Sequence, residues 1–505
     1  MELSDQQKAV VQWVQEGIGH LNLVARAGTG KTTTLIEICK VAQGTIFLGA
    51  YNKKIAEEIK SRLEALGLSN AEASTLHAAG FRAWRKINPS TRVEDRKVAQ
   101  ICQDLGIPWE QRGSFRKVLS LAKQALIFPT KEIDLAAWGE LWETFGLQED
   151  LPISKGVLKT CTSILLKSIE KNEELIDFDD MLYAPLVAGT HIQEYDWVLI
   201  DEAQDTNLAR RELSLRMLKP SSRFVAVGDE KQAIYGFTGA DSNAMDLIKQ
   251  RLNSMELPLN ITYRCPQSVV RLAKEWVQDI QANPTNYEGE VKVILEENFN
   301  IQTPQDDDVI LCRNTKPLIE LAYQAIQAGR GVRVEGREIG IGLIKLAERF
   351  KETDLRKLAL GLQRYKEEET ERLTQENKPQ LIEAVEDKCE TLSLLISQTL
   401  EDDKQTLDDL KQRIGSLFGD THGRQTLLTL STIHKAKGRE WDQVWLWGRN
   451  RYQPSYYAML AKTKGLDWPL EQERNLMYVA VTRAKQSLIE IKVRIPWKNN
   501  TAKGE

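Results

Sequence analysis

The strongest constraint on the fold is a strand–loop–helix segment near the start of the chain, LNLVARAGTGKTTTLIEICKVA, from Leu21 to Ala42. Its loop, ARAGTGKT, is close to the pattern GxxxxGK[ST], with Ala25 in place of the first glycine. Such a loop turns backbone N–H groups towards a phosphate, and the helix dipole adds its positive end. A parallel sheet with a phosphate site at a strand end is therefore expected; a plain glycine-rich turn is the alternative.

The loop predicts a role for each of its residues. Gly28 and Gly30 free the backbone to turn, Lys31 would reach the β- and γ-phosphates, and the Thr32 hydroxyl would bind Mg²⁺. The predicted phosphate-binding residues are Ala27, Gly28, Thr29, Gly30, Lys31, Thr32 and Thr33.

A second segment, YDWVLIDEAQDTN, ends an apolar strand in two acids. In phosphate-loop enzymes a carboxylate at this strand end holds Mg²⁺, which assigns Asp201 as the metal ligand with Thr32. Glu202 can polarise the attacking water as a general base. Capping of the next helix is the alternative for an isolated acid pair, but together with the phosphate loop the pair predicts hydrolysis of ATP with Mg²⁺.

Composition and charge exclude several classes of protein. The 505 residues correspond to about three to four domains. A net charge of −4 excludes a globally basic coat, so a nucleic acid would be held in a local groove. The six cysteines form no CxxC pair, which argues against zinc and for a reducing compartment. The polar start and the lack of a long apolar run favour a cytoplasmic protein with no membrane partner.

An ordered series of segments resembles the superfamily 1 helicases of the UvrD/Rep/PcrA type, in a compact bacterial and phage branch. The segments are LSDQQKAV, AYNKKIAEEI, STLHAAG, DEAQD, VGDEKQAIYGFTGA, TYRCP, VILCRN, STIHKAKGREWDQV and ERNLMYVAVTRAK. One of them is weak evidence, whereas the whole series is specific. The resemblance implies an α/β fold: two RecA-like P-loop NTPase domains with parallel sheets, each carrying a mainly helical insert.

The resemblance also implies which residues meet the nucleotide. The adenine and ribose would meet Gln7, Tyr263 and Glu440. Gln232 would sense the γ-phosphate, while Arg264 and Arg483 would spread over its oxygens. A surface salt bridge is the usual fate of an arginine, and core packing is the alternative for Tyr263. The predicted catalytic residues are Lys31, Asp201, Glu202, Gln232, Arg264 and Arg483.

Single-stranded DNA would be held by flat aromatic faces. Tyr235 and Phe237 lie just past Gln232, so a phosphate sensor and a stacking platform share one loop. The remaining DNA-binding residues that the resemblance implies are Tyr51, Asn52, His77, His434 and Lys437. A lone histidine is more often structural than a ligand.

The motif order divides the chain. It predicts a first RecA-like domain over 1–82 and 174–258 with an insert at 83–173, and a second over 259–345 and 425–497 with a reduced insert at 346–424, before a tail at 498–505. Between Arg82 and Lys123 the first insert carries ten Lys/Arg against four Asp/Glu. That excess suits a wall over a DNA backbone, or a solvated helix face.

These features predict a Mg-ATP-dependent translocase on single-stranded DNA and a DNA helicase, with a 3′-to-5′ direction implied by the resemblance. Its nucleotide would bind in the cleft between the two domains, and its partners would be single strands and single-strand/duplex junctions. The alternative is an ATP-switched DNA-binding subunit that serves a nuclease, transposase or defence partner. An ATPase that acts on no nucleic acid would leave the aromatic loop unexplained.

Overall fold

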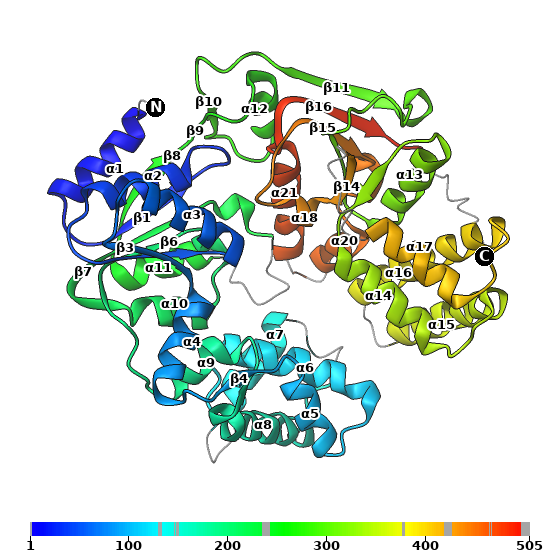
Figure 1. The fold of residues 1–505 in the computed structure, drawn as a ribbon, viewed down its shortest axis with the longest axis horizontal. Helices are drawn as coiled ribbons and strands as arrows, with labels where there is room; N and C mark the ends of the chain where they lie inside the picture. The colour runs from blue at the N-terminus through cyan, green and yellow to red at the C-terminus, as the bar shows by residue number, and fades with distance from the viewer. Residues whose placement is uncertain are drawn as a thin grey trace. The chain divides into compact units, whose positions relative to one another are not determined.

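The computed structural model describes residues 3–129, 134–145, 147, 151–234, 243–375, 379–418, 427–463, 465 and 467–495. The chain divides into two compact units, Met1–Ile261 and Thr262–Glu505. Each unit contains one six-stranded sheet with helices between its strands (Figure 1). All strand pairs of both sheets are parallel, so the predicted α/β class with two parallel sheets is confirmed.

The first sheet has the order β3-β2-β6-β7-β1-β8. Its strands are β1 (Leu21–Ala25), β2 (Ile46–Ala50), β3 (Ala71–Thr75), β6 (Tyr195–Ile200), β7 (Leu218–Gly228) and β8 (Met255–Leu259). The inner strands read as near-continuous apolar runs because both faces of the sheet are covered by helices. On one face lie α1 (Asp5–Glu16), α2 (Lys31–Val41) and α3 (Lys53–Ala65). On the other lie α4 (Leu76–Ile87), α9 (Asp180–Val187), α10 (Leu208–Leu215) and α11 (Ala244–Leu252).

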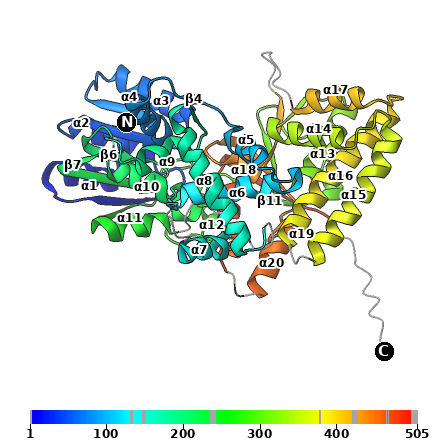
Figure 2. The same cartoon turned by 90° about the horizontal axis from the view of Figure 1, so that it is seen from below.

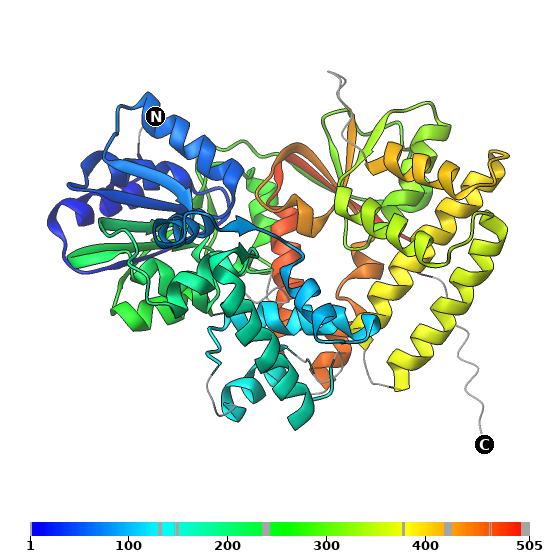
Figure 3. The ribbon, with the colours of Figure 1, turned by 60° about the horizontal axis from the view of Figure 1, so that its bottom comes forward.

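The first insert is a helical module with its own core. It consists of α5 (Lys97–Asp104), α6 (Trp109–Gln124), α7 (Leu135–Phe145), α8 (Lys155–Glu170) and η1 (Lys171–Glu173), and the short strand β4 (Arg92–Val93) pairs with β5 (Leu175–Ile176) (Figure 3, cyan and blue-green). Two of its ten positive charges, Lys97 and Lys123, are buried and pair with Asp180. These two lysines cannot serve the predicted DNA wall.

The second sheet has the order β11-β16-β15-β12-β14-β13. Its strands are β11 (Glu290–Leu295), β12 (Val309–Cys312), β13 (Val332–Val334), β14 (Leu428–Thr432), β15 (Trp441–Trp447) and β16 (Ala484–Lys492). Short β9 (Ile261–Thr262) and β10 (Gln281–Ala282) pair at the start of this unit. Its helices outside the insert are α12 (Gln267–Ala273), α13 (Thr315–Gln327), α18 (Ile433–Ala436), α19 (Arg449–Tyr452), α20 (Tyr456–Thr463) and α21 (Trp468–Val481).

The helices at the second insert are α14 (Arg337–Arg349), α15 (Leu355–Gln375), α16 (Pro379–Glu401) and α17 (Leu407–Phe418), which gather together in Figure 2. Helix α14 begins before the predicted start of the insert at residue 346. Buried residues of all four helices join those of the second sheet in one core. This insert is therefore built onto its unit rather than separate from it. All six cysteines are buried and free of disulfides. Within the described ranges, no helix is both long enough and apolar enough to cross a membrane.

Candidate nucleotide and DNA site

The phosphate loop lies where the sequence predicts it, between the inner strand β1 and helix α2. Gly28 and Gly30 have positive φ angles of 71° and 82°, a backbone conformation that side chains disfavour. A Cβ on Gly30 would also press against the Gln7 amide at 3.0 Å. Ala27 and Thr29 are buried in the loop. The first N–H groups of α2 thus face the carboxyl edge of the sheet, where a phosphate would bind.

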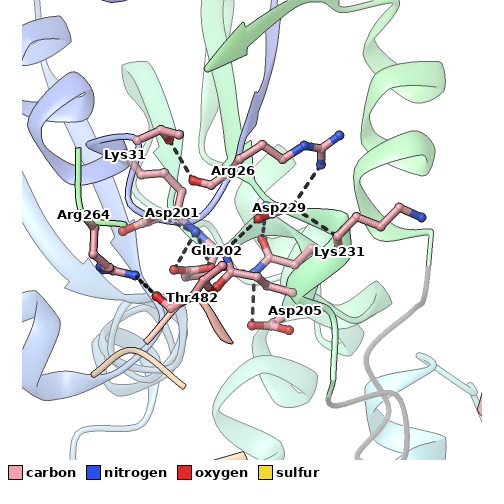
Figure 4. A network of polar contacts seen from close by, with 12 residues as sticks. Arg26, Lys31, Asp201, Glu202, Asp205, Asp229, Lys231, Arg264 and Thr482 are labelled. Carbon is pink, nitrogen blue, oxygen red and sulfur yellow. Dashed lines mark hydrogen bonds and ion pairs between the residues drawn. The ribbon is translucent and has the colours of Figure 1, made fainter. Parts of the chain in front are cut away.

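The acid pair stands at the end of strand β6, which β7 separates from β1 in the sheet, and Glu202 faces the loop lysine. The Lys31 Nζ lies 2.9 Å from both carboxylate oxygens of Glu202 (Figure 4). Burial opposes the charge on Lys31, but the carboxylates of Glu202, Asp201 and Asp229 outweigh it and raise the lysine pKa. Glu202 itself has a φ of 50°, which is costly for a residue with a side chain and occurs most often at functional sites.

Asp201 is a buried carboxylate that the protein's own cation does not fully compensate. Burial, followed by the charge of Glu202, raises the pKa of Asp201 to about 7, while Lys31 acts in the opposite direction. A divalent cation at this carboxylate would favour the ionised form. Thr32, in the first turn of α2, carries a hydroxyl oxygen of the kind Mg²⁺ prefers. The donor set therefore fits Mg²⁺.

A continuous hydrogen-bond path joins Glu202 to Gln232. The Gln204 Nε2 donates to Glu202 at 2.5 Å, and the Gln204 side-chain oxygen accepts from the Asp229 N–H at 3.0 Å. The Asp229 carboxylate accepts from the Gln232 Nε2 at 2.7 Å. The predicted base and the predicted γ-phosphate sensor are thus brought together in one network.

Three members of this network were missed by the sequence interpretation, although their motifs were identified. Gln204 lies inside DEAQD and Asp229 inside VGDEKQ. Arg26 pairs with Asp229 at 3.0 Å. A Cβ on Gly228 would collide with the Gln204 side-chain oxygen, which explains the glycine at the end of β7. The role of these three residues follows from their hydrogen bonds in the structure, and their spacing in the sequence does not indicate it.

Gln7 is buried and engaged within the first unit. Its side-chain oxygen accepts from the Ser4 N–H at 3.0 Å, and its Nε2 donates to the Thr34 hydroxyl at 3.2 Å. The first pair forms a capping box at the start of α1, so Gln7 fixes α1 next to α2. Its predicted contact with adenine stays a prediction.

Aromatic and histidine side chains gather on a second face of the first unit. His77, in the first turn of α4, stacks on the exposed ring of Phe178, with centroids 4.1 Å apart and planes at 22°. Burial and the nearby Arg210 charge lower the pKa of His77 to about 3. The same guanidinium lies 5.7 Å over the Tyr51 ring. Asn52 caps α3 by accepting from the Ile55 N–H at 3.0 Å. Phe178 was not predicted, because no motif placed it beside His77.

The second unit brings its two predicted arginines to one residue, Thr482. Arg264 donates to the Thr482 carbonyl at 3.5 Å (Figure 4) and pairs with Glu440 at 2.5 Å. Arg483 is buried and donates to the Val479 carbonyl and to the Thr482 hydroxyl. Tyr263, next to Arg264, is 41% exposed, so its ring has an accessible face rather than a place in the core.

The remaining predicted residues are divided between described and undescribed segments. His434 lies in α18, and burial followed by the Arg313 charge lowers its pKa to about 3. Lys437 ends that helix. Tyr235 and Phe237 lie outside the described residues.

Comparisons with known proteins agree with these motifs. The model of the UvrD/REP helicase N-terminal domain matches residues 3–253, and that of the UvrD-like helicase C-terminal domain matches residues 345–494. The ATP-dependent DNA helicase UvrD2 of Mycobacterium tuberculosis is 25% identical, over 96% of this chain and 78% of its own length. The F-box DNA helicase protein 1 of Schizosaccharomyces pombe is 24% identical, over 96% of this chain and 57% of its own. The ATP-dependent DNA helicase PcrA of Leuconostoc citreum is 24% identical, over 66% and 47%.

Proposed function

The chain belongs to the UvrD/Rep helicase family, and from that premise we propose that it is a motor that moves along single-stranded DNA in the 3′-to-5′ direction and separates duplexes at single-strand junctions. Membership makes it an ATP-dependent DNA helicase and therefore a DNA-dependent ATPase. The direction of movement, the preferred DNA structure and the role of each site residue belong to the proposal.

The network from Lys31 through Glu202 and Gln204 to Gln232 carries this proposal. Lys31 holds both oxygens of the predicted base, so a γ-phosphate that draws the lysine towards itself would release that carboxylate to a water. Gln232 shares Asp229 and Gln204 with the base, so a change at the phosphate reaches both residues. The arrangement suits a site that binds a nucleotide and then hydrolyses it.

Mg²⁺ would be held by Asp201 and Thr32. Bound there, it would neutralise charge on the β- and γ-phosphates. The chain's own residues would do the rest: Glu202 takes the proton of the attacking water, and Lys31 holds the phosphates. Arg264 and Arg483, from the second unit, would stabilise the phosphoryl oxygens in the transition state. Gln7, Tyr263 and Glu440 would hold the base and sugar.

DNA would be held through stacking and a few polar contacts. In the first unit, Arg210 lies near both Tyr51 and His77, and the exposed ring of Phe178 stacks on His77. A DNA strand would therefore meet flat aromatic faces there. The proposal adds Asn52, Tyr235 and Phe237 in the same unit, and His434 and Lys437 in the second. Burial keeps the proton off the His77 ring, and a neutral ring suits the stacking of His77 on Phe178.

The alternative, an ATP-switched DNA-binding subunit for a nuclease, transposase or defence partner, keeps one specific observation in its favour. The second insert is small and shares the core of its unit, so an independent module for gripping duplexes is not visible among the described residues. A chain that hydrolyses ATP with DNA but never separates strands would favour this alternative.

The first test is steady-state ATP hydrolysis with and without single-stranded DNA, with Glu202→Gln as the blank. Stimulation by the strand, lost in the blank while ATP binding persists, supports the motor. Activity indifferent to DNA contradicts it. Strand separation on duplexes with a 3′ or a 5′ single-stranded tail then tests the direction, because a 3′-to-5′ motor uses only the 3′-tailed substrate.

A further inference from the structure

A chain of polar side chains joins the acidic segment to the first insert. Asn207 follows η2 (Ala203–Asp205), is buried and caps α10 by accepting from the Arg210 N–H at 2.9 Å. The Asn207 Nδ2 donates to the Gln124 side-chain oxygen at 3.0 Å. Gln124 is the helix-terminal residue of α6, so the contact crosses from the sheet's strand-end acids to the insert.

The chain continues from Gln124 to the segment that carries Phe178. The Gln124 Nε2 donates to Asp179 Oδ1 at 3.1 Å, and the Ser120 hydroxyl donates to Asp179 Oδ2 at 2.6 Å. Asp179 directly follows Phe178, the ring that stacks on His77. A cavity of about 650 Å³ opens at this place, and Arg116, Ser120, Phe178 and Asp179 are among its lining residues.

The amide of Gln124 satisfies both neighbours at once. Its oxygen accepts from Asn207 while its nitrogen donates to a carboxylate, and no apolar or acidic side chain offers both groups. Asp179 needs donors, because burial raises its pKa and the hydrogen bonds from Ser120 and Gln124 oppose that shift. The next residue, Asp180, is fixed by Lys97 and Lys123, so Asp179 stands on a rigid support.

We propose that Gln124 is a positioning residue that couples the acidic segment of the nucleotide site to the Phe178–His77 face. Movement of the Glu202–Asn207 segment would shift the Gln124 amide and, through Asp179, the Phe178 ring. In the other direction, a strand stacked on Phe178 would bias the acidic segment. The inference rests on the proposed function, since it needs that face to contact DNA.

The test compares Gln124→Met with the wild-type chain in ATP hydrolysis over a range of single-stranded DNA concentrations. Methionine keeps the side-chain length and removes both hydrogen bonds. We expect the turnover without DNA to stay within about twofold, and the DNA concentration for half-maximal stimulation to rise about five- to tenfold, the usual size of coupling between two sites. Gln124→Glu, which keeps the acceptor for Asn207 but sets a second carboxylate against Asp179, should show the same loss.

Two controls separate coupling from local damage. Ser120→Ala removes a hydrogen bond to Asp179 and a second one that the Ser120 hydroxyl accepts from the Gln124 Nε2. It keeps both contacts of the path, from Asn207 to Gln124 and from Gln124 to Asp179, so it should keep normal stimulation. Gln100→Met removes an exposed amide contact with Asp104 in the same insert and should also be normal. Melting temperatures show whether each variant folds, and Gln124→Glu gives the answer where Gln124→Met does not fold.

Each remaining outcome overturns the inference. Wild-type-like stimulation in Gln124→Met and Gln124→Glu would show that the path carries no coupling. Equal losses with and without DNA, or an equal loss in Ser120→Ala, would reduce Gln124 to a structural contact. A wild-type chain whose hydrolysis ignores DNA would overturn the proposed function as well, which distinguishes the two failures.

Discussion

At the scale of single residues, Gln204 supports the nucleotide site from behind. In our proposal it does not touch the phosphate itself. It donates to Glu202 and accepts from the Asp229 N–H, so it orients the predicted base. We expect Gln204→Met to lower maximal ATP turnover about tenfold or more, the usual cost of removing such a supporting contact, with little change in ATP affinity. Gln12→Met, which removes an exposed contact with Glu16, is the control. Steady-state kinetics in which Gln204→Met and Gln12→Met match would remove Gln204 from the mechanism.

Asn22 is a residue whose loss should strengthen the fold. It lies in the inner strand β1, is fully buried, and neither polar atom of its side chain has a hydrogen-bond partner among the described residues. Replacing an unpaired buried amide by an apolar group of similar size removes a penalty of about 1–3 kcal/mol. Asn22→Leu should therefore raise the free energy of unfolding in urea, whereas Asn70→Leu, which loses an exposed contact with the Gly44 carbonyl, should not. A less stable Asn22→Leu chain would show that Leu does not fit.

The sequence could predict site residues that stand in contiguous motifs. It could not predict residues whose role depends on a contact with a residue far away in the chain. Lys31, Asp201 and Gln232 each follow an apolar strand within a few residues, and parallel strands bring such loops to one edge. Gln124 meets Asn207 from another part of the chain, and Phe178 meets His77 in the same way. No local pattern marks either pair.

At the scale of elements, the structure of the first insert shows which of its positive side chains are buried and which are exposed. Composition alone does not distinguish the two. The Lys123 side chain on α6 is 1% exposed and pairs with Asp177 at 2.5 Å, whereas Arg116 on the same helix is exposed. Lys123→Met should cost about 3–5 kcal/mol of unfolding free energy, because it leaves buried carboxylates unpaired, with no change in the salt dependence of DNA binding. Arg116→Met should leave stability unchanged and reduce the slope of log K against log salt by about 0.7–1. The reverse pattern would contradict this division.

His77, on helix α4, makes the stability of the fold depend on pH. Burial, then Arg210, lowers the pKa of His77 in the folded state to about 3, below its value of 6.5 in the unfolded chain. The unfolded chain thus binds the proton first, so stability is complete above pH 6.5 and falls as the pH drops from 6.5 towards 3. At pH 5, 1.5 pH units below 6.5, the loss is about 2 kcal/mol. His77→Gln should be flatter between pH 7 and pH 5 in urea unfolding; an equal slope would assign the effect to other groups such as His434.

Strands at the edge of a sheet are harder to predict from the sequence than inner strands. β3 reads AEAST and is only partly buried, so it lacks the apolar run that marks the inner strands and was not predicted. The inner strands β1, β6 and β12 and the second half of β7, residues 224–228, are buried on both faces and stand out as apolar runs. Burial on both faces therefore makes a strand of a parallel sheet predictable.

At the scale of the whole molecule, the proposal requires that two units with separate sheets serve one nucleotide. Arg264 belongs to the second unit, where it pairs with Glu440, whereas Lys31 and Glu202 belong to the first. We expect Arg264→Ala to lower ATP hydrolysis about 10³-fold, the lower range for an arginine that stabilises phosphoryl transfer. ATP affinity should change far less, because the phosphate loop is intact.

The control for this prediction is Arg271→Ala, which breaks an exposed ion pair with Glu288 in the same unit. It should leave hydrolysis unchanged. Single-turnover hydrolysis and nucleotide binding, measured on both variants, separate loss of chemistry from loss of binding. Normal single-turnover hydrolysis in Arg264→Ala would mean that the first unit hydrolyses ATP without this arginine, and it would remove Arg264 from the proposed mechanism.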